Sequence, residues 1–153
     1  MRALVQCVSE AKVVVDGQTV GAIDKGFLVL LGVGHADGEE QACKLWAKIS
    51  KMRVFEDETG KANLSLADIG GSVLVVSQFT LFANCKKGNR PSFTDAAAPE
   101  RAEELYGRFL DLARQTMEEN GTGQVACGRF GAMMDVSLVN HGPFTIWLDT
   151  DTL

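Results

Sequence analysis

The sequence predicts a single domain of the α/β class, in which mixed β-sheets carry two helices packed on one side in β/β/α layers. Its 153 residues, of which 46% are hydrophobic, suit one domain with a packed core. Apolar stretches with strand patterns surround two segments whose apolar residues recur at helical spacing. No repeat or linker divides the chain, so residues 1–153 are expected to form one unit.

The N-terminal part predicts four strands. Asp16-Gly17 stands between two valine-rich stretches and is a strong signal for a two-residue hairpin turn. The run Phe27-Leu28-Val29-Leu30-Leu31-Gly32-Val33 is continuously apolar between glycines, which favours a central strand buried on both faces. The expected strands cover residues 2–9, 12–16, 18–23 and 27–33.

A first amphipathic helix follows. Negative charges at Asp37, Glu39 and Glu40 suit a helix N-terminus. The apolar residues at helical spacing are Ala42, Leu45, Trp46, Ile49 and Met52. A short strand at 53–56, a turn at 57–60 and a second core strand from Ser72, just after Gly70-Gly71, complete the middle of the chain.

A second helix and two strands end the chain. The helix begins at 95–99, because proline is tolerated in a first turn, and it ends at Gly121. Its apolar stripe consists of Ala102, Leu105, Tyr106, Phe109, Ala113 and Met117. Strands are expected at 133–139 and 144–149, separated by residues 140–143, since Pro143 has no N–H for a ladder.

Composition narrows the possible functions. The net charge of −5 excludes binding of DNA or anionic membranes by bulk attraction, so any contact with RNA or phosphate must be local. No secretion signal or membrane-spanning segment is present, which predicts a cytoplasmic protein without a membrane partner. The four cysteines form no CxxC pair and have no histidine at a ligand interval, so we expect reduced thiols, no metal and no cofactor.

Three polar side chains follow the apolar strand 73–76 in the segment Ser77-Gln78-Phe79-Thr80. In an extended strand Ser77 and Phe79 would share one face, whereas Gln78 and Thr80 would share the other. This pattern presents a polar pair beside a strand end, as a binding or catalytic site would. The alternative is a strand that simply emerges from the core.

Two loops are further candidates. In Asn140-His141-Gly142-Pro143, the glycine would let backbone carbonyls approach a ligand closely, although a simple β-turn has the same pattern. Lys86, Lys87 and Arg90 form the only dense basic loop of an acidic protein. This loop could hold phosphates or be an ordinary solvated loop.

Common catalytic motifs are missing. His35 and His141 are the only histidines, and no hydrolase triad is apparent. Gly32-Val33-Gly34 lacks the following helix of a dinucleotide-binding fingerprint, and the sequence contains no GxSxG, P-loop or HExxH motif.

Several separated motifs nevertheless resemble one family. They are Ser77-Gln78-Phe79-Thr80-Leu81, Gly88-Asn89-Arg90-Pro91-Ser92-Phe93, Gly128-Arg129-Phe130 and the run from Val136 to Thr145 that contains Asn140-His141-Gly142-Pro143. The opening Arg2-Ala3-Leu4-Val5-Gln6, the central Gly32-Val33 and the run from Gly70 to Val76 also match, in the same order. The chain thus resembles the D-aminoacyl-tRNA deacylase (D-tyrosyl-tRNA(Tyr) deacylase) family over its whole length.

The resemblance implies a deacylase-like fold and a cytoplasmic homodimer. The dimer would hydrolyse the ester that joins a D-amino acid, or mischarged glycine, to the 3′ end of tRNA, without a cofactor or metal. The implied catalytic residues are Gln78, Phe79 and Thr80. The implied substrate-binding residues are Ser77, Phe130 and Met134, together with Gly142 and Pro143 acting in the partner's pocket. Two departures are His141, where an acidic residue is common, and Phe144, where a small aliphatic residue is usual.

A mechanism without a triad is expected, because the aminoacyl ester is activated and the ribose 2′-hydroxyl can assist its hydrolysis. Backbone N–H groups around Phe79 and Thr80 would stabilise the oxyanion. We expect the Gly142-Pro143 bond to be cis, so that its carbonyls capture the substrate amino group and block an L side chain. Lys86, Lys87 and Arg90 are expected to contact tRNA phosphates.

The sequence is also compatible with two other functions. Thr80 or Ser77 could attack the ester as a nucleophile, with His141 as base. Alternatively, the chain could be a non-catalytic module that binds RNA ends or small molecules.

Overall fold

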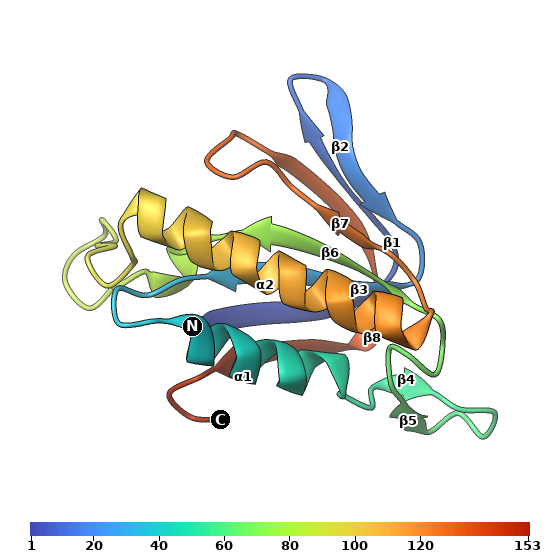
Figure 1. Cartoon of the computed structure of the whole chain (residues 1–153). Helices are drawn as coiled ribbons and strands as arrows, with labels where there is room; N and C mark the ends of the chain where they lie inside the picture. Colours follow the sequence, from blue (N-terminus) through green and yellow to red (C-terminus); the bar gives the residue numbers. More distant parts are fainter.

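The computed structural model describes residues 1–153 and confirms a mixed sheet with two helices on one side (Figure 1). The neighbouring strands along the sheet, in spatial order, are β2 (Gln18–Ile23), β1 (Arg2–Val15), β3 (Gly26–Gly32), β6 (Ser72–Ser77) and β7 (Val125–Cys127). The long strand β8 (Asp135–Asp149) also pairs with β1. The β3–β6 and β6–β7 pairs are parallel, whereas all pairs of β1 are antiparallel. A separate hairpin joins β4 (Phe55–Glu56) to β5 (Ala62–Leu64).

Strand β1 is continuous, so the prediction of separate strands at 2–9 and 12–16 is wrong. Its first half pairs with β3 and its second half with β2, while β8 accompanies both halves. The register shifts between Val8 and Glu10, opposite Asn140 and Val139. A β-bulge at this point accommodates one extra residue without ending the ladder. The polar Ser9-Glu10 pair therefore marks a change of partner, not a break.

Strand β8 is also continuous, contrary to the predicted break at residues 140–143. Gln6 pairs with Thr145 and Val8 with Asn140, so residues 141–144 bulge out opposite the single residue Cys7. Pro143 lies in this bulge, where its missing N–H removes no ladder hydrogen bond. The Gly142-Pro143 peptide bond is cis, as expected from the sequence.

Both helices are confirmed. Helix α1 covers Glu39–Ser50 and helix α2 covers Pro99–Asn120, with Pro99 as its first residue and Gly121 in the left-handed region at its end. Asp37 lies outside α1. Its carboxylate instead accepts hydrogen bonds from the Met1 amino group at 2.5 Å and from the Gly34 N–H at 2.6 Å.

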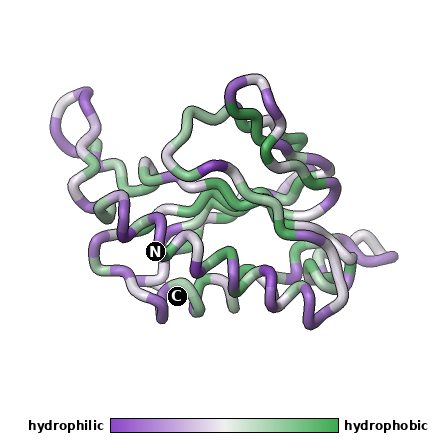
Figure 2. The backbone as a smooth tube through the Cα atoms, turned by 45° about the horizontal axis from the view of Figure 1, so that its top comes forward, coloured by the Kyte–Doolittle hydropathy of each residue, from purple (hydrophilic) through white to green (hydrophobic).

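Two cores lie on opposite faces of the sheet. The larger core packs β-strand residues such as Phe27 against helix residues such as Phe109. The smaller core, which includes Val13 and Leu74, fills the inside of the curled sheet. Figure 2 shows the apolar stretches concentrated in the central strands. The curl brings β2 beside β7, where Gln124 Nε2 donates to the Ala22 carbonyl at 3.3 Å.

No helix of this structure combines the length and the apolar character needed to cross a membrane.

Candidate functional site

The polar segment after β6 forms a turn, not the extended strand that the sequence predicted. Strand β6 ends at Ser77, and a 3-10 helix, η1, covers Phe79–Phe82. The Gln78 N–H donates to the Leu31 carbonyl at 2.7 Å, which ties the start of the turn to β3. Gln78 Nε2 donates to Thr80 Oγ1, so these two side chains do meet, as predicted, but through the turn rather than through strand alternation.

Two glycines of β3 and the following loop make room for η1. A Cβ on Gly32 would lie 3.0 Å from the Gln78 oxygen and 3.1 Å from the Leu81 Cβ. A Cβ on Gly34 would lie 2.8 Å from two ring carbons of Phe82. The glycines of Gly32-Val33-Gly34, a motif that does not fit a dinucleotide site, therefore provide the space into which the turn with the candidate residues packs.

Arg2 also contacts η1, although the sequence assigned it no role. Its Nε donates to Asp149 Oδ2 at 2.8 Å, and its NH1 group donates to the Leu81 carbonyl at 3.1 Å. The guanidinium carbon lies 4.3 Å from the ring centroid of Phe82. One side chain thus joins β1, β8 and the turn. Sequence spacing offers no signal for it, because its partners lie about half a chain and a whole chain away.

The side chains of the turn differ in exposure. Ser77, Gln78 and Thr80 are half-buried, whereas Phe79 is 56% exposed. The Phe79 ring makes an edge-to-face contact with Phe93 at a centroid distance of 5.1 Å. Within one chain, no histidine hydrogen-bonds to Ser77 or Thr80, and the hydrogen-bond partner of the Thr80 hydroxyl is the Gln78 amide.

The segment with Phe130 and Met134 lies beyond β7, beside β6. The Gly128 N–H donates to the Val75 carbonyl at 3.0 Å, and the Tyr106 hydroxyl donates to the same oxygen at 2.9 Å. The Phe130 ring packs against Tyr106 at 5.8 Å, and burial raises the pKa of the Tyr106 hydroxyl. A Cβ on Gly128 would lie 2.6 Å from the Met134 sulfur, so Met134 packs directly over the Gly128 backbone.

Gly142 and Pro143 are exposed on the bulge of β8. Gln6 Nε2 donates to Asn140 Oδ1 at 3.2 Å, and so links β1 to one end of the bulge. No hydrogen bond joins Gly142 or Pro143 to residues 77–80 of the same chain. The nearest atom to a Cβ on Gly142 would be Asn140 Nδ2 at 3.6 Å, so this glycine is not demanded by its own chain.

The basic loop is closed at its base and free at its tip. Asn84 and Ser92 exchange two backbone hydrogen bonds, of 2.7 and 3.0 Å. Between them, Lys86, Lys87 and Arg90 are exposed and form no ion pair within the chain. Three uncompensated positive charges therefore stand within a few residues of η1.

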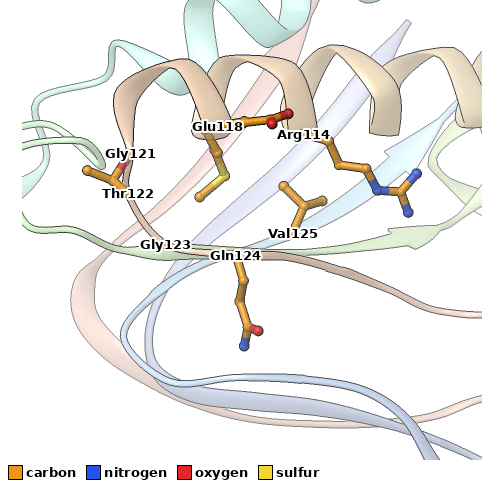
Figure 3. A pocket seen from close by; sticks show the side chains of 8 residues that line it. Arg114, Glu118, Gly121, Thr122, Gly123, Gln124 and Val125 are labelled. Carbon is orange, nitrogen blue, oxygen red and sulfur yellow. The ribbon is translucent and has the colours of Figure 1, made fainter.

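Two cavities lie away from these residues. One, of about 340 Å³, lies between the end of α2 and the start of β7, and Figure 3 shows Arg114 and Glu118 on the helix above it. Gln124 points away from the helix, toward the Ala22 carbonyl that it binds. The other cavity, of about 460 Å³, lies among charged side chains of α1 and α2. Neither contains a residue that the sequence singled out as a site.

Two solved structures have a similar overall fold. The structure described as c-Myc DNA Unwinding Element Binding Protein is 42% identical, with a TM-score of 0.89, over 97% of this chain and 98% of its own. A structure described as a probable eukaryotic D-amino acid tRNA deacylase has a TM-score of 0.80 over 96% and 97% of the two chains. At 18% identity, it supports the fold alone.

A model of the D-Tyr-tRNA(Tyr) deacylase family matches residues 4–149, and the chain belongs to this family. A relative from Thermotoga petrophila, named D-aminoacyl-tRNA deacylase, is 56% identical over 100% of this chain and 99% of its own. A protein of the same name from Thermus aquaticus is 54% identical over 98% of this chain and 95% of its own. Family membership confirms the resemblance expected from the sequence motifs.

Proposed function

We propose that this protein hydrolyses the ester bond of D-aminoacyl-tRNA and releases free D-amino acid and reusable tRNA. The observation that carries the proposal is the family match over residues 4–149, together with relatives named D-aminoacyl-tRNA deacylase that are more than half identical over almost the whole chain. Mischarged glycyl-tRNA is a second proposed substrate, since glycine has no side chain to be rejected. Because the substrate is aminoacyl-tRNA, we propose that the protein acts in the cytoplasm.

Catalysis is proposed to depend on backbone donors, not on a nucleophile. Phe79 and Thr80 head the η1 turn, and the first N–H groups of a helix have no acceptor within it. These groups would face the oxyanion of the ester, while Gln78 and Thr80 orient the sugar and water. Thr80 Oγ1 already accepts a hydrogen bond from the Gln78 amide, which is not a base, and this favours positioning over nucleophilic attack.

Each site is proposed to use two chains. The Gly142-Pro143 bulge is exposed and makes no hydrogen bond to the 77–80 segment of its own chain, so it is free to enter a partner's site. There its carbonyls would accept hydrogen bonds from the substrate amino group, and the rigid backbone would exclude an L side chain. Ser77, Phe130 and Met134 would line the rest of the pocket.

The exposed surface of β8 supports the dimer. This strand is 15 residues long and pairs only with β1, so its other edge is unpaired. Its outer face carries Val139 and Trp147, which are 51% and 48% exposed. Long unpaired edges with apolar side chains are rarely left uncovered in native proteins, and an isologous dimer would cover both copies.

The substrate test compares the purified chain on D-Tyr-tRNA and L-Tyr-tRNA. We expect release of D-tyrosine and little release of L-tyrosine. Equal hydrolysis of both esters would reject the chiral mechanism. Binding of aminoacyl-tRNA with the ester left intact would instead favour a non-catalytic RNA-end module.

The catalytic test uses Thr80→Ala. We expect a slower single-turnover reaction but not a complete loss, because the backbone N–H groups are retained. Complete loss with intact tRNA binding, or a trapped acyl-enzyme in mass spectra, would show that Thr80 is a nucleophile.

The basic loop is proposed to contact phosphates near the acceptor end of tRNA. Neutralising Lys86, Lys87 and Arg90 together should weaken binding of all tRNAs and flatten its dependence on salt, because fewer counterions would be released. An unchanged salt slope would return the loop to an ordinary solvated surface.

The dimer is tested by light scattering at the concentration of the activity assay. A dimeric mass is expected, and a fully active monomer would contradict the shared site.

A further inference from the structure

We infer that Arg2 is a positioning residue that holds the η1 turn in its reactive geometry. The inference concerns the side chain of the second residue, which reaches across the sheet from β1 to the carbonyl of Leu81. It rests on the proposed function in one respect, namely that the backbone of Phe79 and Thr80 faces the scissile ester.

The turn needs an external support because it is short. It contains four residues, and one or two turns of helix are not stable in isolation. At its start, the Gln78 N–H is bound to the Leu31 carbonyl at 2.7 Å. At its end, Arg2 is the only side chain that hydrogen-bonds to the turn backbone, through the Leu81 carbonyl at 3.1 Å. The position of the intervening Phe79 and Thr80 therefore depends on both ends.

Arg2 is itself held in place. Asp149 Oδ2 accepts a hydrogen bond from Nε at 2.8 Å, and both side chains are largely buried, at 29% and 14% exposure. The guanidinium carbon also lies over the rings of Phe82 and Trp147, at 4.3 Å and 5.8 Å from their centroids. The cation is thus fixed by a carboxylate and by aromatic rings before it binds Leu81, so little conformational freedom remains in the contact.

Arginine suits this position for a geometric reason. The planar guanidinium offers separate N–H groups in fixed directions, and here Nε and NH1 bind Asp149 and Leu81 at the same time. A lysine ammonium is a single point of charge. At this position it can bind the carboxylate or reach the carbonyl, and it has no planar face for the Phe82 ring. We therefore expect Arg2→Lys to resemble the loss of the contact, despite the retained charge.

The kinetic test measures single-turnover deacylation of D-Tyr-tRNA at saturating enzyme. Under this condition the rate constant does not depend on the fraction of folded protein. We expect Arg2→Met, which keeps much of the apolar stem, and Arg2→Lys to lower the rate constant roughly tenfold to a hundredfold, as displacements of up to 1 Å do.

A matched control is available far from the site. Arg108 on α2 pairs with Glu39 on α1 at 2.6 Å, and Arg108→Met makes the same chemical change in an exposed ion pair. Its rate constant should equal that of the wild type. Equal rate constants for Arg2→Met, Arg2→Lys and the wild type would overturn the inference, even if the Arg2 variants were less stable.

A second measurement separates this inference from the proposed function. Backbone amide resonances of residues 78–82 in a ¹H–¹⁵N spectrum should shift in Arg2→Met and remain unchanged in Arg108→Met. Unchanged resonances in both variants would refute the positioning role. A wild-type protein that fails to hydrolyse D-Tyr-tRNA would refute the proposed function alone, since the spectra would still decide whether Arg2 places the turn.

Discussion

Replacing Gly32 by alanine tests whether the close packing of the η1 turn against Gly32 sets the position of the Phe79 and Thr80 backbone. The added Cβ would lie 3.0 Å from the Gln78 oxygen, 3.1 Å from the Leu81 Cβ and 3.3 Å from a ring carbon of Phe82. These distances are shorter than ordinary contacts, so the turn must move away from β3 by a few tenths of an ångström. Two of the three neighbours belong to the fixed part of the turn, and they cannot swing aside as the end of a flexible side chain would.

Two magnitudes follow from this displacement. Overpacking a well-filled site costs about 1–3 kcal/mol, which lowers the melting temperature by about 2–4 °C per kcal/mol in a domain of this size. A misplacement of about 1 Å can reduce a rate a hundredfold, so a few tenths of an ångström should reduce it roughly threefold to tenfold. We therefore expect a folded protein with a clear catalytic defect.

The assay pairs a thermal melt with single-turnover deacylation of D-Tyr-tRNA at saturating enzyme. Gly107→Ala is the matched control, because Gly107 lies inside α2 with nothing within 4 Å of its added Cβ. This control should gain about 0.5–1 kcal/mol of stability from better helix propensity and keep its rate constant. A Gly32→Ala protein with the wild-type rate constant would show that packing against Gly32 does not position the η1 turn for the reaction.

Three further outcomes are expected. Gly142→Ala should leave the melting temperature of a single chain nearly unchanged, since the added Cβ makes only an ordinary contact of 3.6 Å with Asn140 Nδ2. It should slow deacylation, because the bulge is proposed to enter a partner's pocket, and a loss of stability that matches the loss of activity would argue against this. Tyr106→Phe should cost about 1 kcal/mol in a denaturant titration, because the Val75 carbonyl keeps its hydrogen bond from Gly128, and a cost above about 3 kcal/mol would contradict this. Burial raises the pKa of the Cys7 thiol from 9.0 to about 11. The folded state therefore holds the thiol proton more tightly than the unfolded state, and this contribution to the unfolding free energy is complete below pH 9 and is lost as the pH rises toward 11. The loss should reach at most about 1.4 kcal/mol per pH unit, and Cys7→Ala should remove this part of the alkaline decline in unfolding free energy.

The local elements could be predicted from the sequence because their signals are local. Apolar residues every three or four positions predict α1 and α2, and the continuous run from Phe27 predicts the central strand. The motif around Ser77 to Thr80 marked the candidate site without any structure. Its resemblance to a family identified the reaction, because the residues of such motifs are adjacent in the chain.

The tertiary structure decided what depends on distant partners. The polar pair Ser9-Glu10 and the Gly142-Pro143 pair, which lacks one N–H, predict strand ends when only neighbours along the chain are considered. Strands β1 and β8 nevertheless continue through them as bulges, because each strand supplies the other's hydrogen bonds. The three-residue strand β7 was missed for the same reason, since it has no period of its own and exists through pairing with β6.

The same distinction applies to the site. Period-two alternation could not reveal that the chain turns at Phe79, because that turn is set by contacts with Gly32 and Gly34 on another element. The roles of Arg2 and Asp149 were equally hidden, since 147 positions separate them and only the β1–β8 register brings them together. The sequence by itself determined the family resemblance, the candidate site residues, the two helices and the central strand. Folding decided their geometry, because hydrogen-bond partners and steric contacts between remote segments leave no periodic pattern in the chain.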